Sequence, residues 1–570
     1  MVFLLAFNRL NLNMGTVISN FILIGVLFSS LIAQEWEQSY SAGGFDDNGI
    51  FMGGSEALHL VTHKNMLFAS IGYWQDGNNF WYGGEDLNIG WSQIICLENK
   101  DANWQVDFDL GYNFVRPEIL KQVIFTKDNN GNALDFPDTM LIVGSYSANF
   151  LSGIVNASIF VRDDESNGSW TQIIVHQGYF SSNESYSMRD IELYTDQITG
   201  IENLLISVGT QGIYSGKYNP NVDGNIEIGL VPEVGPLGIR PLGITVANDQ
   251  LYFSSGNKIF KRNDGPEPDY DVVHDFNDLN SYIDPAVGGI RGLTTIPNPF
   301  GLDESMLLMW CPNGQSKGTI FRLDHTDTQE FDRVYETKIS LLVEDHLPGE
   351  TVNYLLGAYN EFYLFTDPIT QIDHYLIGIE SLLQENIYPS WNGFYSGGII
   401  VKRDNNGQYG LEEINDAIGF DDIPLVSVRC YVESPFEDEN AIYFGGFDPN
   451  GHPSINNAWI YKKTWNVSDL EINEKRPIVN FKVYDNYPNP FNPITQIRYD
   501  LPKEGMVSII IYDALGRKIR SLLNERLQAG SKSVHWDATN SSGETVSSGV
   551  YYCRIVSSKF SQTKKMIFLK

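Results

Sequence analysis

Arginine recurs at one place in a repeated pattern of this chain. Five arginines and one asparagine stand near the start of successive apolar segments, at positions Arg116, Arg189, Arg240, Arg291, Asn360 and Arg429. The guanidinium group is a planar fork of donors that suits carboxylate, sulfate or phosphate. If the apolar segments are strands that converge on one axis, these side chains form a region of positive potential in a chain of formal net charge −33. The pattern therefore predicts a site for an anionic ligand, such as a uronate or a sulfated glycan.

The same arginines also have a structural interpretation. Converging strands leave carbonyl and carboxylate oxygens that buried arginines satisfy, so the ring would then only hold the repeated units together. Two observations distinguish the interpretations: whether the side chains reach a common cavity, and whether each is already paired with an acid.

Other motifs that carry chemistry are few. The sequence has no HExxH, phosphate-binding loop or dinucleotide fingerprint. His59 and His63 share a strand face, which more often marks a polar face than a metal site. The segment 128–132 begins like a calcium loop, but Ala133 stands where the turn glycine is needed, so it indicates a turn. We expect no cofactor; calcium held by acids from several units is left open, and metal ligands are unknown.

The elements that would position the arginines repeat seven times. One apolar strand pattern recurs at 65–69, 139–143, 203–207, 250–254, 305–309, 374–378 and 441–445. A second strand and a polar turn follow each copy, and an aromatic residue usually opens one more strand, as at Trp104, Trp170, Tyr270, Phe331 and Tyr409. Four strands per unit are typical of propeller blades. We predict an all-β, seven-bladed β-propeller; merging the short fourth unit with a neighbour gives six blades as the alternative.

A propeller must close, because an open blade exposes an unpaired sheet edge. The seventh unit lacks a clear outer strand, whereas the segment 35–40 begins like the outer strand that Trp104 opens. We expect this N-terminal segment to complete the last blade. The propeller then spans residues 34–465, and the charged segment 466–480, which contains Pro477, is the linker to a further domain.

The N-terminus carries a targeting pattern. The apolar run 21–28 is short for a membrane span and is followed by small residues up to Ala33. This predicts a signal peptide over residues 1–33, with a retained membrane anchor as the alternative.

Composition limits the mature protein further. A chain of 570 residues is too long for one compact core, so two or more domains are expected. With 71 acids against 38 bases, binding to nucleic acid or to an anionic membrane is not expected. The four cysteines are isolated, so they specify no disulfide and indicate buried thiols.

Residues 481–570 have the pattern of a small β-sandwich. The runs 507–512 and 550–556 are rich in β-branched and aromatic residues and lie between glycines. Prolines 488, 490 and 493 force an extended entry before the first strand. Short strands at this spacing indicate an immunoglobulin-like sandwich.

The motifs of this last domain, 487–493, 511–517, 548–552 and 564–570, resemble the type A C-terminal sorting domain of the type IX secretion system. The resemblance implies a sandwich like that of flagellar hook-capping proteins, and it marks Pro488, Pro490, Gly516, Arg517, Gly549, Tyr551 and Lys565 as motif positions. It also implies recognition in the periplasm and passage through the outer membrane by the type IX machinery. The domain would then be exchanged for a lipopolysaccharide anchor, or the protein released. The expected location is outside the cell or on the outer-membrane surface of a Gram-negative-type bacterium.

Three functions remain open for the propeller, which resembles only uncharacterised bacterial secreted propeller proteins. The first, which we favour, is binding of an extracellular ligand, a carbohydrate or another anionic ligand, without chemistry. The second is a hydrolase or lyase acting on an extracellular ester, lactone or polysaccharide. The third is a structural or adhesive surface protein. No catalytic residue is assigned.

Overall fold

The computed structural model describes residues 35–72, 92–465 and 481–569, apart from short gaps, the longest of which are 384–393, 415–424 and 448–455. The predicted signal peptide and linker lie outside these residues. The fold is built almost entirely from strands, with one α-helix, α2 (Ile339–His346), among the described residues. None of the described helices is both long and apolar enough to cross a membrane.

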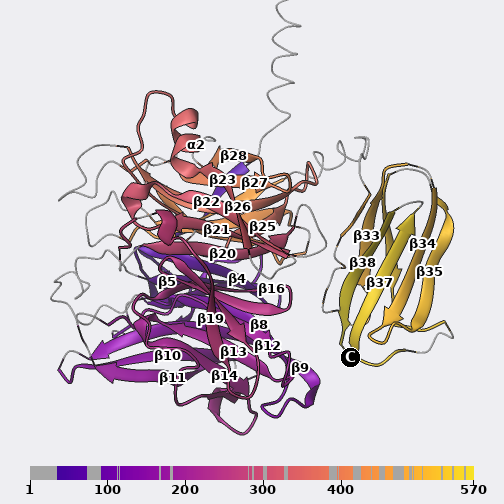
Figure 1. Ribbon diagram of the computed structural model, residues 1–570, viewed down its shortest axis with the longest axis horizontal. Helices are drawn as coiled ribbons and strands as arrows, with labels where there is room; N and C mark the ends of the chain where they lie inside the picture. The colour runs from indigo at the N-terminus through magenta and orange to yellow at the C-terminus, as the bar shows by residue number, and fades with distance from the viewer. Residues whose placement is uncertain are drawn as a thin grey trace, which may run out of the picture.

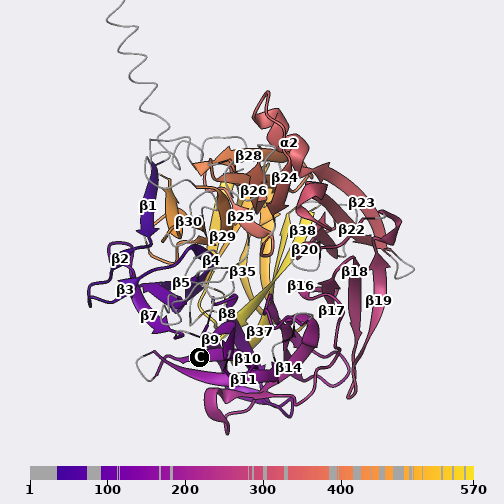
Figure 2. The same cartoon turned by 90° about the vertical axis from the view of Figure 1, so that its left-hand side faces the viewer.

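Seven antiparallel sheets surround a central axis (Figure 2). Along the chain, the sheets of the first three blades are β4 (Glu56–His63) to β7 (Gln105–Asp109), β8 (Ile119–Lys127) to β11 (Ser169–Tyr179), and β12 (Ile191–Thr195) to β15 (Ile226–Ile228). The next two are β16 (Pro241–Ala247) to β19 (Asp269–Asp275) and β20 (Gly289–Pro297) to β23 (Phe331–Lys338). The sixth runs from β24 (Tyr354–Gly357) to β28 (Tyr409–Glu413), and the seventh joins β29 (Ser427–Glu433), β30 (Ala441–Phe447) and β31 (Trp459–Thr464) to β1 (Glu35–Ser41). The seven-bladed prediction is confirmed, and the six-bladed alternative is wrong.

The blades hold together because their middle strands bury both faces. Every residue of β13 (Glu202–Val208) is buried. Leu204 and Ile206 pack in one cluster with apolar side chains of the second blade, whereas Leu205 packs with Ile244 and Phe253 of the fourth. Alternate residues of a strand point to opposite faces, so a near-continuous apolar strand joins two neighbouring sheets.

The first described strand closes the ring. β1, which was expected to complete the last blade, pairs antiparallel with β31, with Trp36 opposite Lys463. Trp36 and Tyr40 are buried. The pairing leaves β31 without an open edge, because β30 covers its other side.

The inner strand of the sixth blade is interrupted. Both β24 and β25 (Tyr363–Thr366) pair with β26 (Asp373–Leu382), and the chain between them leaves the sheet. Asn360 Nδ2 donates to the carbonyls of Leu58, 2.8 Å away on the first blade, and of Arg429, 3.0 Å away on the seventh. Tyr359 contacts Arg189 of the third blade and Glu361 contacts Lys121 of the second, so residues 359–361 reach across the axis, and we call them the axial plug.

The C-terminal domain is a β-sandwich of two antiparallel sheets (Figure 1). One sheet contains β32 (Lys482–Val483), β33 (Thr495–Leu501) and β36 (Gly530–Trp536). The other contains β34 (Gly505–Asp513), β35 (Lys518–Leu527), β37 (Gly549–Ser557) and β38 (Phe560–Phe568). Trp536, Phe491 and Phe568 pack between the sheets.

Candidate functional site

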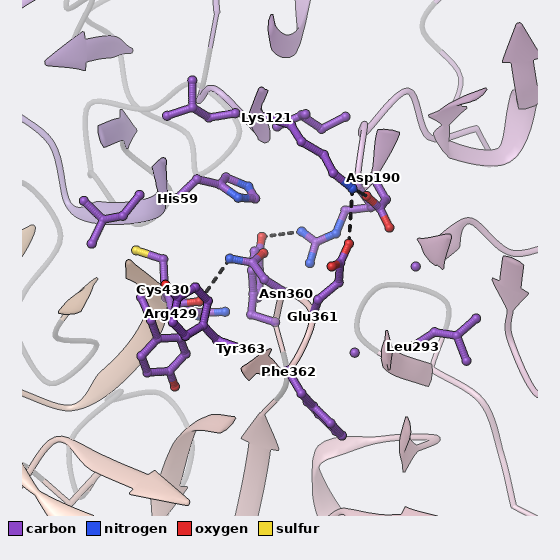
Figure 3. A pocket seen from close by; sticks show the side chains of 18 of the residues that line it. His59, Lys121, Asp190, Leu293, Asn360, Glu361, Phe362, Tyr363, Arg429 and Cys430 are labelled. Carbon is purple, nitrogen blue, oxygen red and sulfur yellow. Dashed lines mark hydrogen bonds and ion pairs between the residues drawn. The ribbon is translucent and has the colours of Figure 1, made fainter. Parts of the chain in front are cut away.

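A cavity of about 430 Å³ lies on the propeller axis beside the plug. All seven blades contribute to its lining, including His59, Lys121, Arg189, Asp190, Gly243, Leu293, Glu361 and Arg429 (Figure 3). Its volume falls within the range of about 300 to 1,000 Å³ that is usual for small-molecule sites. The cavity collects side chains that are far apart in sequence because every inner strand runs along the same axis.

Two of the predicted ring residues are paired with acids. Arg116 contacts Glu56 and Glu118, each at 2.9 Å, and Arg429 Nη2 lies 3.1 Å from Glu380 Oε2. Glu56 belongs to the first blade and Glu380 to the sixth, so these bonds join each arginine to the preceding blade. For Arg116 and Arg429 the structural interpretation therefore holds: each arginine connects two neighbouring blades.

Arg240 and Arg291 lie near the same cluster without lining the larger cavity. Arg240 Nη1 donates to Ser187 Oγ at 3.1 Å, and Arg291 lines a chamber of about 10 Å³ together with Tyr359 and Arg429. Burial and the positive charge of Arg189 lower the pKa of both arginines.

Arg189 differs from the paired ring residues. Its side chain lines the cavity, it is only 8% exposed, and it has no carboxylate partner among the described residues. Its Nη1 donates to the hydroxyl of Tyr359, and its guanidinium lies 3.9 Å from the centre of that ring. A buried charge without a counterion is costly, so Arg189 is suited to meet an anionic group of a ligand.

Tyr359 of the plug is held between two arginines. The guanidinium of Arg429 lies 4.1 Å from its ring centre, in addition to that of Arg189. Burial raises the pKa of Tyr359, but the positive charges of Arg116 and Arg189 outweigh it, so the net shift is downward. We call Arg189, Arg429 and Tyr359 the basic wall of the cavity.

Three carboxylates share one ammonium group at another part of the cavity. Lys121 Nζ lies 3.3 Å from Glu361 Oε1 and 3.8 Å from Asp190 Oδ1 (Figure 3). The same nitrogen lies 2.5 Å from Oε2 of Glu192, which does not line the cavity. Burial raises the pKa of Asp190 and of Glu192; Lys121 opposes this shift, and the charge of Glu361 adds to it. We call the three carboxylates and Lys121 the acidic rim.

His59 also lines the cavity and is neutral near pH 7. Its Nε2 contacts the carbonyl oxygen of Glu118 at 2.8 Å, so this nitrogen carries the hydrogen and Nδ1 is an acceptor. Burial lowers the pKa of His59 to about 4. His63 instead contacts Gln122 and Asp164 of the second blade, each at 2.8 Å.

Within the described part of the chain, no three or more histidine, cysteine or acidic side chains are grouped so that they could hold a metal ion. The segment 128–132 is a turn, as expected: Asp128 Oδ1 accepts from the backbone nitrogens of Asn130 and Asn132, at 2.9 and 2.8 Å. Calcium binding stays a prediction without an assigned site.

The described sorting-motif residues lie in turns and at strand ends of the sandwich. Gly516, with φ of 75°, and Arg517 form the turn between β34 and β35, where Arg517 Nε donates to Asp513 at 2.6 Å. Gly549 begins β37, and the Tyr551 hydroxyl donates to the carbonyl of Ser547 at 2.6 Å. Lys565 is exposed on β38. Pro488 and Pro490 lie outside the described residues.

The chain is thus a seven-bladed β-propeller that carries a C-terminal β-sandwich. Residues 485–569 match the family model described as the secretion system C-terminal sorting domain. The sandwich is therefore a type IX sorting domain that interacts with the type IX machinery, and the protein is secreted or displayed on the surface of a Gram-negative-type bacterium. No curated protein matches the chain.

Solved structures with a similar arrangement share little sequence with this chain. A type-IX secretion surface component of Porphyromonas gingivalis, PorZ, is 12% identical with a TM-score of 0.31, over 90% of this chain and 82% of its own. A fungal alcohol oxidase in complex with copper is 10% identical with a TM-score of 0.41, over 95% of this chain and 100% of its own. The α-L-arabinofuranosidase Arb93A of Fusarium graminearum is 10% identical with a TM-score of 0.37, over 76% of this chain and 98% of its own. Similarities this low say nothing of activity here.

The sequence pattern missed the most distinctive parts of the site. The plug was not expected, because Asn360 was placed on an unbroken inner strand. Lys121 and Glu361 were not singled out either, since their spacing carries no motif and only the ring brings them within 3.3 Å. One signal was readable: the polar residues 359–361 interrupt an otherwise apolar segment.

Proposed function

We propose that this exported propeller binds an extracellular carbohydrate that carries an anionic group, in the axial cavity and without chemistry. The observation that supports it is Arg189, a buried cation that lines the cavity and has no carboxylate partner in the described chain. A ligand carboxylate or sulfate would supply the counterion and accept bonds from the fork of the guanidinium.

The rest of the lining suits a sugar. His59 and Asn360 offer polar partners for hydroxyl groups, and Tyr363 adds an aromatic side chain. The plug consists of polar side chains, and a cavity remains beside it, which weighs against a purely structural propeller with a filled channel.

A second function is favoured by one observation. Asp190 has a pKa raised to about 7 by burial, and it lies with Glu361 at the acidic rim. A buried acid of raised pKa beside a second carboxyl group is an arrangement that glycoside hydrolases use. However, Asp190 also accepts from the backbone nitrogens of Ile191 and Ile244, at 2.8 and 2.6 Å, which favours a positioning role. Release of new reducing ends from a polyuronate by the full chain would establish this second function.

Titration calorimetry of the full chain with glucuronate, galacturonate and glucose tests the proposal. We expect the two acid sugars to bind and glucose to bind more weakly. Arg189→Gln should weaken binding of the acid sugars by about tenfold or more, since a hydrogen bond to a charged group contributes about 1.5 to 3 kcal/mol.

The matched control is Arg333→Gln, at an arginine that pairs with exposed Asp278 and does not line the cavity. This variant should bind like the unchanged protein. Absence of binding by both acid sugars, or equal binding by the Arg189 variant, would contradict the proposal.

A further inference from the structure

The cavity presents charge of both signs to whatever enters it. At the acidic rim, Asp190, Glu192 and Glu361 face one ammonium group, that of Lys121, and no other cation among the described residues forms an ion pair with them. Burial raises the pKa of Asp190 to about 7, so this carboxyl is partly protonated near neutral pH. The two glutamates with one cation still leave an excess of negative charge. At the basic wall, the Arg189 guanidinium has no carboxylate partner in the described chain, which leaves an excess of positive charge.

Both charged groups are positioned by the plug. Tyr359 accepts from Arg189, and Glu361, two residues further on, reaches Lys121 at 3.3 Å. Phe362, the next residue, is fixed by a bond from its backbone nitrogen to Thr294 Oγ1 of the fifth blade at 2.9 Å. One short segment therefore places a cationic contact and an anionic contact at two parts of a single cavity.

Glu361 is the accessible member of the acidic rim. Its side chain is 46% exposed, whereas those of Glu192 and Asp190 are 25% and 12% exposed. Lys121 contacts Glu192 more closely than it contacts Glu361, so Glu361 keeps oxygen atoms that an incoming cation reaches.

From this geometry we infer that the cavity is selective for a zwitterionic amino sugar, whose carboxylate meets Arg189 while its ammonium group meets Glu361. The inference rests on the proposed function and names its ligand class. A cavity with opposite charges at the rim and the wall favours a ligand that carries both charges. A ligand with only a carboxylate is repelled by the acidic rim, and a ligand with only an ammonium group is repelled by the basic wall.

The test compares four monosaccharides on the full chain by titration calorimetry, at about pH 6.5 so that carboxylates and sugar amines are both charged. Muramic acid carries both groups, glucuronate only the carboxylate, glucosamine only the amine, and glucose neither. We expect muramic acid to bind about tenfold more tightly than glucuronate, and glucosamine to bind most weakly of the three charged sugars.

Glu361→Gln isolates the contribution of the acidic rim. It should remove the advantage of muramic acid, while glucuronate binds at least as tightly as before. Glu350→Gln, at an exposed acid that does not line the cavity, is the matched control and should keep the advantage. Equal binding of glucuronate and muramic acid, or an advantage that survives Glu361→Gln, overturns the inference and leaves anionic binding intact. If neither acid sugar binds, the proposed function fails as well.

Discussion

The side chains around the axis differ in whether the protein itself satisfies them. Arg116 and Arg429 have carboxylate partners at 2.9 and 3.1 Å, so ligand binding is not needed to explain their burial. Arg189 has a phenol instead of a carboxylate. The repeated arginine pattern in the sequence predicted a cluster of guanidinium groups on the axis, but it could not distinguish these cases. The partners belong to other blades, and their distances depend on how the ring closes.

A second single residue, His59, makes the free energy of unfolding depend on pH. Burial holds its folded pKa at about 4, against about 6.5 for an unfolded histidine. Between these values the unfolded chain binds more protons, so the free energy of unfolding falls as the pH falls from 6.5 to 4. Arg116, Lys121 and Arg189 add to this effect, because their charges disfavour a protonated imidazole.

We therefore expect His59→Gln to lose less stability than the unchanged protein over this range. The difference between the two proteins in the free energy of unfolding that they lose should approach about 3 kcal/mol at pH 4, since each unit of pKa shift corresponds to about 1.4 kcal/mol. Urea unfolding at several pH values measures it. Parallel stability curves for the two proteins would show that His59 does not titrate in this way.

In several blades, the third strand carries a cation that contacts an acid of the preceding blade. Each of four blades carries a cation there that contacts an acid of the preceding blade: Arg162 with Asp107, Arg262 with Glu233, Arg403 with Glu336, and Lys463 with Glu412. The cations follow the recurring apolar strand pattern and were readable from it. Their partners were not, because no spacing along the chain relates one blade to the next.

Arg403 allows this contact between blades to be tested. Its Nε and Nη2 each donate to Glu336 at 2.6 Å, and both side chains are buried. Removing one partner of a buried pair leaves a charge without compensation, so Arg403→Ala should lower the free energy of unfolding by about 3 kcal/mol or more.

The comparison for this prediction is Lys100→Ala, at an ion pair with Asp101 that is exposed on both sides. Surface pairs contribute about 1 kcal/mol or less, so this variant should unfold almost like the unchanged protein. Urea denaturation of both variants measures whether the buried pair contributes more to the free energy of unfolding than the exposed pair. An Arg403 variant as stable as the Lys100 variant would mean that the blades hold together by apolar packing alone.

For the molecule as a whole, the sequence was sufficient for the architecture. Seven copies of an apolar pattern predicted seven sheets, because a repeated unit that cannot bury both faces alone must pack against its neighbours. The sequence was not sufficient to predict which residues occupy the propeller axis. The plug exists because β24 and β25 pair with the same strand at two places, and sequence periodicity does not show such a break.

Closure of the ring depends on a single strand with two large buried side chains. Trp36 is 7% exposed and packs against Phe444, with ring centres 5.2 Å apart. Trp36→Ala should lower the free energy of unfolding by about 3 to 5 kcal/mol, as is usual for a buried tryptophan. Gln38→Ala, at an exposed position of the same strand, should change it little. Equal unfolding midpoints in urea for the two variants would show that β1 does not hold the ring closed.

The pairing of β1 with β31 also joins the two ends of the propeller sequence. These strands lie at opposite ends of the propeller sequence, so closing the loop between them costs much conformational entropy, and we expect their contacts to form late. Until these strands pair, the blades are a row of sheets with two unpaired edges. Unpaired sheet edges promote aggregation, so we expect the open ring to aggregate more readily than the closed one.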